Sequence, residues 1–149
     1  MRLEPLYRVE FTYPEAWSIE LAGEHGTQWQ DFYLAEGACT GRIAGRMRGA
    51  NHPGRRTDGT FGPDFQGVIE TADGAEIFFE WRGYGRAYPP GRRQIVVSGT
   101  HLSQDSRYRW LNDVVCVGTG EVRARPDRDS PDLAIDVAEL IWEPPAETG

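Results

Sequence analysis

Apolar and polar residues alternate along several short segments of the chain, as they do in β-strands that bury one face. In residues 7–13 every second side chain is aromatic or aliphatic, and we expect Pro14 to end this strand because proline cannot donate a ladder hydrogen bond. The apolar residues near the C-terminus change phase after Val137, which indicates a β-bulge. The same pattern predicts further strands at residues 31–36, 41–48, 94–100, 114–117 and 133–142.

The clearest turn signal is Asp73-Gly74, which separates two segments rich in aromatic and β-branched residues, 65–71 and 75–81. Asp-Gly favours a tight β-hairpin in which both turn residues adopt positive φ. Alternation divides each strand of this hairpin into two faces, and the sequence allows either face to line a barrel interior.

Helical periodicity is weak along the whole chain. We expect only two short helical turns, at residues 14–21 and 103–111, with Ser103 as the cap of the second. About eight short strands with hairpin-type connections are typical of an antiparallel β-barrel or sandwich, and a barrel is our prediction. One all-β domain is expected over residues 1–143, a length that suits a single core. The segments expected to be mobile are residues 49–63, 127–131 and a flexible C-terminal tail at 144–149.

Charge and composition narrow the range of partners. The chain has 23 acidic and 16 basic residues, a net charge of −7, which argues against nucleic acid as a partner. Five arginines fall within residues 42–56, where they form either an anion site or, as we favour, a solvated charged face. No apolar run approaches the ~18 residues of a membrane helix, and the polar N-terminus does not resemble a signal peptide. We therefore expect a cytoplasmic protein with no membrane partner.

The sequence contains no motif that indicates a cofactor or a metal ion. Its three histidines lack metal-ligand spacing, and neither cysteine is close to a histidine in the sequence. Phosphate-binding and dinucleotide-binding fingerprints are missing as well. We predict neither a cofactor nor a metal site, and we interpret Cys39 and Cys116 as small buried thiols.

Several short motifs occur in an order that resembles a known family. A glycine-rich segment at residues 37–49 precedes Pro63-Asp64, and T-x-D-G-A follows at residues 71–75. Arg82-Gly83 and the motif R-Y-x-W-L-N at residues 107–112 complete the order. Together these elements resemble the bacterial family known as domain of unknown function 3237, over nearly the whole chain.

This resemblance implies a small antiparallel β-barrel, similar to allene oxide cyclase, lipocalin and dirigent-type barrels, and it implies no defined activity. It also implies an acidic residue followed by an aromatic one near the end of the glycine-rich segment, where this chain has Asn51-His52. Either His52 has replaced the acidic residue, or the role of that residue is lost here.

Three residues are candidates for acid–base catalysis: Asp64, Glu80 and His101. Both carboxylates are expected near one barrel mouth beside Arg82, which would hold one of them ionised while an apolar wall raises the pKa of the other. The family resemblance favours Asp64 as the base. The alternative reading is structural, with the carboxylates in solvent, Asp64 at a strand start and His101 satisfied by its neighbours.

Five residues are candidates for binding a small molecule. Trp110 and Asn112 share a face, so that an aromatic ring can stack on the indole while the amide binds an oxygen of the ligand. Tyr33 and Tyr84 would supply hydroxyls, and Arg82 would supply a cation. Each residue also has a structural alternative, such as Trp110 in the core or Tyr84 on the surface.

We predict a cofactor-independent enzyme that isomerises, eliminates from or cyclises an aromatic or polyketide-like metabolite. The alternatives are a lipocalin-like carrier without turnover and a packed structural subunit of a homodimer or other homo-oligomer. A cavity of at least ~300 Å³ that holds a carboxylate with a shifted pKa would indicate the enzyme. The same cavity with neutral polar groups would indicate the carrier, and a filled interior would indicate the structural subunit.

Overall fold

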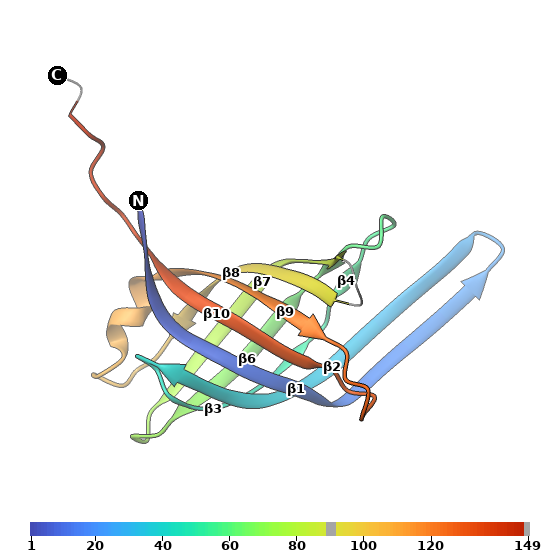
Figure 1. The fold of residues 1–149 in the computed structure, drawn as a ribbon, viewed down its shortest axis with the longest axis horizontal. Helices are drawn as coiled ribbons and strands as arrows, with labels where there is room; N and C mark the ends of the chain where they lie inside the picture. Colours follow the sequence, from blue (N-terminus) through green and yellow to red (C-terminus); the bar gives the residue numbers. More distant parts are fainter. Residues whose placement is uncertain (89–91, 148–149) are drawn as a thin grey trace.

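Ten β-strands form one antiparallel sheet in the computed structural model, which describes residues 1–88 and 92–147 (Figure 1). Two very short strands make a flap beside β7, and the others close into a ring in the order β1-β2-β3-β6-β7-β8-β9-β10, with β10 paired back onto β1. The strands are β1 (Arg2–Gly23), β2 (Gly26–Gly41), β3 (Gly45–Asn51), β4 (Gly54–Arg55), β5 (Phe61–Gly62), β6 (Asp64–Thr71), β7 (Glu76–Tyr88), β8 (Arg92–Leu102), β9 (Val115–Arg123) and β10 (Asp132–Ile141).

The ring closes because its strands carry apolar side chains at alternate positions, so that closure buries most of one face of the sheet. In β7, for example, Ile77, Phe79 and Trp81 are buried, whereas the intervening Glu80 and the following Arg82 are exposed. The arrangement confirms the predicted all-β antiparallel barrel and excludes the sandwich.

Beyond the ring, β1 and β2 continue as a long two-stranded arm (Figure 1). β1 pairs with β10 only as far as Phe11, but it pairs with β2 all the way to Gly23. The prediction that Pro14 ends the strand is wrong. Pro14 lies beyond Phe11, the last β1 residue paired with β10, and within a register shift of the β1–β2 ladder between Thr12 and Glu15, where a proline is tolerated. The helical turn predicted at residues 14–21 is also wrong, since apolar residues there recur with period two and the segment pairs with β2.

The hairpin predicted around Asp73-Gly74 is confirmed and joins β6 to β7. Its turn is looser than expected: the Thr71 N–H donates to the Ala75 carbonyl at 2.8 Å, and the Gly74 N–H donates to the Thr71 carbonyl at 3.0 Å. Of the turn residues only Gly74 has a positive φ, 91°. The connection is therefore the longer hairpin form that places one left-handed glycine after the turn.

A bulge accompanies the phase change near the C-terminus, but it lies on the partner strand. The register between β1 and β10 slips between Pro5 and Tyr7, and this slip buries the successive residues Leu6 and Tyr7. The extra residue of a bulge bends its strand and sharpens the local twist, which helps a sheet to curl into a ring.

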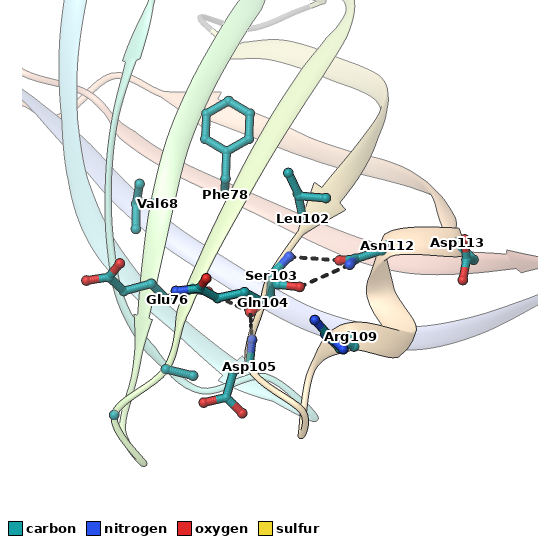
Figure 2. Close-up of a pocket in the computed structure, with 12 residues that line it drawn as sticks. Val68, Glu76, Phe78, Leu102, Ser103, Gln104, Asp105, Arg109, Asn112 and Asp113 are labelled. Atoms are coloured by element: carbon teal, nitrogen blue, oxygen red, sulfur yellow. Dashed lines mark hydrogen bonds between the residues drawn. The ribbon is translucent and has the colours of Figure 1, made fainter.

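The second predicted helical turn is present, but its helix begins later than expected. It is a 3₁₀ helix, η1 (Arg109–Asp113), preceded by a turn in which the Asp105 N–H donates to Ser103 Oγ at 3.3 Å. The Asn112 side chain closes this segment onto β8, because its Oδ1 accepts the Ser103 N–H at 2.8 Å and its Nδ2 donates to the Ser103 carbonyl at 3.0 Å (Figure 2). No described helix is long and apolar enough to cross a membrane.

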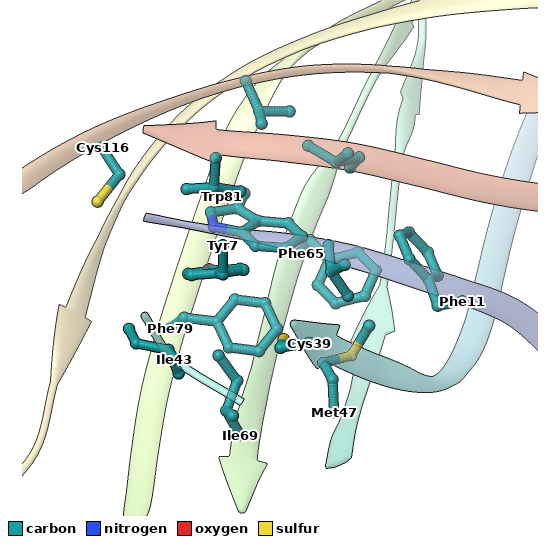
Figure 3. Packing of buried hydrophobic residues seen from close by; sticks show 14 of the residues in the cluster. Tyr7, Phe11, Cys39, Ile43, Met47, Phe65, Ile69, Phe79, Trp81 and Cys116 are labelled. Carbon is teal, nitrogen blue, oxygen red and sulfur yellow. The ribbon is translucent and has the colours of Figure 1, made fainter. Parts of the chain in front are cut away.

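Large side chains fill the end of the ring nearest η1, which we call the closed end (Figure 3). Ile69 and Phe79 are fully buried there, and the ring of Phe79 lies 4.5 Å from that of Trp81 between centroids. Two fully buried residues cover this end, Ile43 from the connection between β2 and β3 and Leu111 from η1.

The segments expected to be mobile differ in their secondary structure. Residues 49–63 contain the end of β3 and both flap strands, whereas residues 127–131 lie outside every described strand. Of the predicted tail, residues 144–147 also lie outside the strands, and residues 148–149 lie outside the described part of the chain.

Candidate ligand-binding cavity

The opposite end of the ring, which we call the open end, contains a cavity of about 850 Å³. Its volume falls within the range of small-molecule sites, roughly 300–1,000 Å³. The wall is mostly aromatic and aliphatic, and its large members are Phe11, Tyr13, Phe61, Phe65, Trp81 and Ile95. The ring is therefore filled at one end and hollow at the other.

The inward residues of β7 explain much of this asymmetry. From the closed end to the open end they run Ile77, Phe79, Trp81, Gly83, Gly85. Gly83 has to be glycine, because a Cβ there would lie 1.9 Å from the carbonyl oxygen of residue 96. Along this one strand the inward side chains are large at the closed end and absent at the two glycines of the open end. β7 therefore leaves space unfilled at the open end.

Arg93 brings a positive charge to the cavity wall. Its guanidinium carbon lies 4.1 Å from the centre of the Phe61 ring, a cation–π contact between two residues of the cavity wall. Burial lowers the pKa of Arg93 below its usual value. No carboxylate within residues 1–88 and 92–147 lies within 4.0 Å of this guanidinium, so its charge is not balanced by an ion pair there.

The flap is anchored to the arm by an ion pair whose carboxylate is buried. Arg55 of β4 donates to Asp31 of β2 at 2.9 Å, and the Ser18 hydroxyl donates to the same carboxylate at 2.6 Å. Asp31 is only 1% exposed. The guanidinium of Arg55 also stacks on Trp29 and on Phe61, at 4.7 and 5.0 Å. These contacts keep Phe61 in place at the cavity wall, with Arg93 as its second cation.

Tyr13 presents a hydroxyl proton to the cavity region. Asn51 Oδ1 accepts the backbone N–H of Asp64 at 3.1 Å, which fixes the amide so that Nδ2 donates to Tyr13 Oη at 3.0 Å. Tyr13 therefore accepts this bond and keeps its own proton for another acceptor. Burial raises the pKa of Tyr13 to about 12, so the phenol stays protonated at neutral pH. Its ring stacks on Tyr33, which also lines the cavity.

A polar cluster of three buried side chains is enclosed in the closed end. Tyr7 Oη and His101 Nε2 lie 2.7 Å apart, and Cys116 Sγ lies 3.5 Å from His101 Nδ1. Burial lowers the pKa of His101 to about 4, so its imidazole is neutral near pH 7. Burial also raises the pKa of Cys116 to about 11 and that of Cys39 to about 12, and both thiols are free and buried.

The structure places the predicted catalytic residues outside the cavity. Asp64 and Arg82 face each other across β6 and β7, with 3.4 Å between Asp64 Oδ1 and Arg82 Nε, but on the outer face of the ring. They line a shallow outer groove beside the flap. Glu80 is an exposed residue of the same outer face, and His101 belongs to the closed end. Their catalytic roles stay predictions, and the cavity does not bring the three together.

Of the predicted binding residues, only Tyr33 lines the cavity. Tyr84 lies on strand β7 and not on a loop, with the Arg86 guanidinium 4.5 Å from its ring centre. Trp110 belongs to η1 at the closed end, where its Nε1 donates to the Arg107 carbonyl at 3.1 Å. Asn112 borders a surface depression next to η1 (Figure 2), and both ends of its amide are hydrogen-bonded to the Ser103 backbone.

Of the pair Asn51-His52, the first residue lines the cavity and the second does not. Asn51 is buried and lines the cavity, whereas the His52 ring lies outside it, with Nε2 2.9 Å from Gln30 Oε1. Of the two alternatives for this position, replacement of an acidic residue by His52 finds no support at this cavity, because His52 contacts the arm on the outer side. The inward residue of this pair is a neutral amide.

The remaining charges of the described chain are mostly paired. Four of the five arginines within residues 42–56 make ion pairs at the surface: Arg42 with Glu139, Arg46 with Glu36, Arg48 with Glu70, and Arg56 with Asp58. In the part of the chain that the structure describes, no three side chains of His, Cys, Asp or Glu gather as a metal site would require.

Sequence reasoning missed Arg93, Tyr13, Asn51 and Phe61. The signal for Tyr13 was present, because it continues the inward alternation of Tyr7, Val9 and Phe11. Arg93 also shares the parity of the apolar residues that follow it on β8. The role of Phe61 depends on the flap, whose two-residue strands no periodicity can reveal.

Comparisons with known proteins agree with this architecture. The profile of the family described as "Protein of unknown function (DUF3237)" matches residues 1–140. A search of curated proteins finds no match. A β-barrel-like protein from Acinetobacter baumannii is 21% identical, with a TM-score of 0.78 over 94% of this chain and 96% of that one.

Two further solved structures are similar at the level of the fold. A protein of unknown function from Clostridium acetobutylicum is 16% identical, with a TM-score of 0.77 over 95% of this chain and 100% of that one. A protein described as an enzyme, from Penicillium herquei, is 23% identical, with a TM-score of 0.60 over 91% of this chain and 93% of that one. At these identities the likeness extends to the fold alone.

Proposed function

The chain belongs to the DUF3237 family, whose activity is not defined, and within that frame we propose that it binds a flat aromatic small molecule carrying a negative charge. The proposal rests on Arg93, an arginine without a described ion-pair partner that lines a mostly aromatic cavity. An aromatic wall recognises a flat ring, and a guanidinium recognises a carboxylate or phenolate through two parallel hydrogen bonds.

The arrangement of the wall gives each part of such a ligand a partner. The rings of Phe65 and Trp81 offer flat apolar surface, and their centroids lie 5.5 Å apart. The Tyr13 hydroxyl can donate to a carbonyl or phenol oxygen, because its own proton has no acceptor among its described hydrogen bonds. Arg93 is already partly withdrawn from water, so binding an anion there loses less hydration than at a fully solvated arginine.

A cofactor-independent enzyme that transfers a proton is the second candidate. Asp129 lines the rim of the same cavity, so a base and the Tyr13 acid border one space. The buried part of the wall, however, is mostly apolar. Its polar members are neutral groups such as Asn51, together with the cation Arg93. Acid–base enzymes place a carboxylate where burial shifts its pKa, and Asp129 is exposed. Binding without turnover therefore fits the cavity better.

Calorimetric titration with two naphthalene probes tests the binding proposal. We expect 2-naphthoate to bind the protein more tightly than 2-naphthalenemethanol, which has the same ring and no charge. Arg93→Gln should weaken 2-naphthoate binding about tenfold or more, since a hydrogen bond to a charged group contributes about 1.5–3 kcal/mol. The neutral probe should change less than about twofold, because it makes no ion pair.

Arg86→Gln is the matched control, because Arg86 lies on the same end of the sheet but stacks on Tyr84 at the outer face. It should bind 2-naphthoate like the parent protein. Equal losses in the two arginine variants, or equal affinity for the two probes, would contradict the proposal.

Proton exchange distinguishes the second candidate. In D₂O, an enzyme of this kind would exchange the α-protons of 2-tetralone faster than buffer does, and Asp129→Asn would remove the excess rate. We expect no excess rate in the parent protein, which NMR integration of the α-protons measures directly. An excess rate that depends on Asp129 would replace the binding proposal by the catalytic one.

A further inference from the structure

The arm is an unusual element because it leaves the ring on its own. β10 stops pairing with β1 at Phe11, and β3 pairs with β2 only from Tyr33 onward. From Glu15 to Phe32 the two strands therefore have only each other as described ladder partners (Figure 1). A ribbon of two strands is marginally stable in water unless a further strand or a packed surface supports it.

One face of the arm carries a stripe of large apolar side chains. Trp17, Ile19 and Leu21 alternate along β1 and are 48%, 66% and 68% exposed. Phe32 lies opposite Trp17 and is 41% exposed. Together these four side chains expose on the order of 400 Å² of apolar surface, which is as large as the patches that mark interaction sites on monomers.

The two edges of the arm differ. Along β2 the flap covers part of the edge, since His52 contacts Gln30 and Arg55 pairs with Asp31. Along β1, in residues 15–23, no other described strand pairs on the outer side. This edge presents unpaired backbone donors and acceptors next to the apolar stripe, which is the arrangement that accepts a further strand.

We propose that the occupant of this edge is the same edge of a second copy of this chain, paired antiparallel about a two-fold axis at Ile19. An antiparallel pair with equal residue offsets on either side of one position is self-complementary, as a symmetric dimer requires. In this register Ile19 meets Ile19 of the partner subunit, and Trp17 meets Leu21 of the partner subunit. Apolar residues thus face apolar residues across the axis.

The polar face of the arm fits the same register. Ser18 lies opposite Glu20 of the partner subunit, so the two acidic side chains of this face avoid each other. The result is a four-stranded sheet with a continuous apolar stripe from both copies. The tip of the partner's arm would lie beside Glu15, next to the cavity residues Pro14 and Ala16. A second copy therefore stabilises the arm and borders the mouth of the cavity.

The size of the contact sets the expected strength. The stripe covers about half of the ~800 Å² that each partner contributes to a standard interface, so we expect a dimer that forms in the micromolar range. The net charge of −7 opposes association, and added salt should therefore tighten the dimer modestly.

Sedimentation equilibrium between about 5 and 500 µM tests the proposal, a range chosen for an interface of this size. The parent chain should move from monomer to dimer, and Ile19→Lys should remain a monomer because two lysines would meet at the axis. Val68→Lys is the matched control, as Val68 is a partly exposed apolar residue on the outer face of β6. It should dimerise like the parent. A monomeric parent chain, or a dimer that persists in Ile19→Lys, overturns the proposal.

Mild oxidation of single cysteine variants tests the register, independently of any effect of lysine on folding. In an antiparallel pair, opposed residues have Cα atoms about 4.5–5.5 Å apart, which suits a disulfide, so Ile19→Cys should give a covalent dimer. Leu21→Cys should not, because its equivalent in the partner would lie about 13 Å away along the strands. The native thiols are buried and do not interfere. Equal crosslinking at both positions, or none at position 19, rejects this pairing.

Discussion

The closed and open ends of the ring are built by the same eight strands, yet one is solid and the other is hollow. At the closed end the inward positions carry Ile69, Ile77 and Phe79, and two residues from outside the ladder, Ile43 and Leu111, complete the packing. At the open end β7 carries glycines, and the covering elements are a short flap and an arginine. The comparison shows that strand alternation decides what faces inward, while residue size along each strand decides where space remains.

The two ends also treat polar groups differently. In the closed end, the side chains of Tyr7, His101 and Cys116 lie within hydrogen-bonding distance of one another. In the open end, Tyr13 keeps a free proton and Arg93 has no described ion pair. Buried polar groups are usually satisfied internally, and the end where they are not is the end that can bind a partner molecule.

The largest expected effect is a difference between the two ends in how much a truncated side chain lowers the free energy of unfolding. Phe79→Ala removes a fully buried ring from the closed end and should lower the free energy of unfolding by about 3–5 kcal/mol. Phe61→Ala removes a partly exposed ring from the flap and should lower it by less than about 1 kcal/mol, while weakening the binding of 2-naphthoate. Urea denaturation followed by tryptophan fluorescence measures both values.

Similar losses of stability in the two variants would contradict the contrast between the ends. The m-value serves as the control for this experiment, because an unchanged slope shows that the same surface is exposed on unfolding in parent and variant.

The next effect concerns pH and the closed end. Unfolded His101 takes up a proton near pH 6.5, whereas the folded protein resists protonation until about pH 4, because burial disfavours the charged ring. Between these values the unfolded state binds more protons, so stability falls as the pH falls, by about 3 kcal/mol for a shift of this size. The loss begins below about pH 6.5 and is complete near pH 4.

Other groups titrate in this window, so the measurement compares the parent with His101→Phe at each pH from about 7 to 4. The parent's stability relative to the variant should decline steadily as the pH falls. A constant difference would show that His101 is protonated equally in the folded and unfolded states.

The fold could be predicted because its signals are local. The alternation in β1, β6 and β7 and the turn at Asp73-Gly74 are read within a few residues, and closure then follows from the need to bury one face. The arm could not be predicted because proline ends strands in most contexts, whereas Pro14 lies past the end of the β10 pairing at Phe11 and within a register shift between β1 and β2. Strand β10 lies more than a hundred residues further along the chain.

The site was harder to predict, because the sequence alone does not show which face of each strand points into the ring. Asp64 and Arg82 do pair, as expected from their types, but the choice between the two faces of the hairpin depends on the whole ring. For Arg93, by contrast, the sequence did contain a signal for the inward face. Its parity with Ile95 and Val97 placed it inward, although an arginine is seldom expected inside a barrel.

The smallest effect on ligand affinity is expected at Trp110, which the sequence made a candidate both for ligand binding and for the core. Trp110 lies on η1, at the opposite end of the ring from the cavity, and its ring is partly exposed beneath the Arg42 guanidinium at 4.8 Å. Trp110→Ala should therefore leave the affinity for 2-naphthoate within about twofold of the parent and lower stability by about 1 kcal/mol, the loss typical of a partly buried contact. Calorimetry and urea denaturation measure the two quantities on one preparation. A large loss of affinity would mean that the ligand enters near η1, and the contrast between a binding end and a structural end would then have to be reversed.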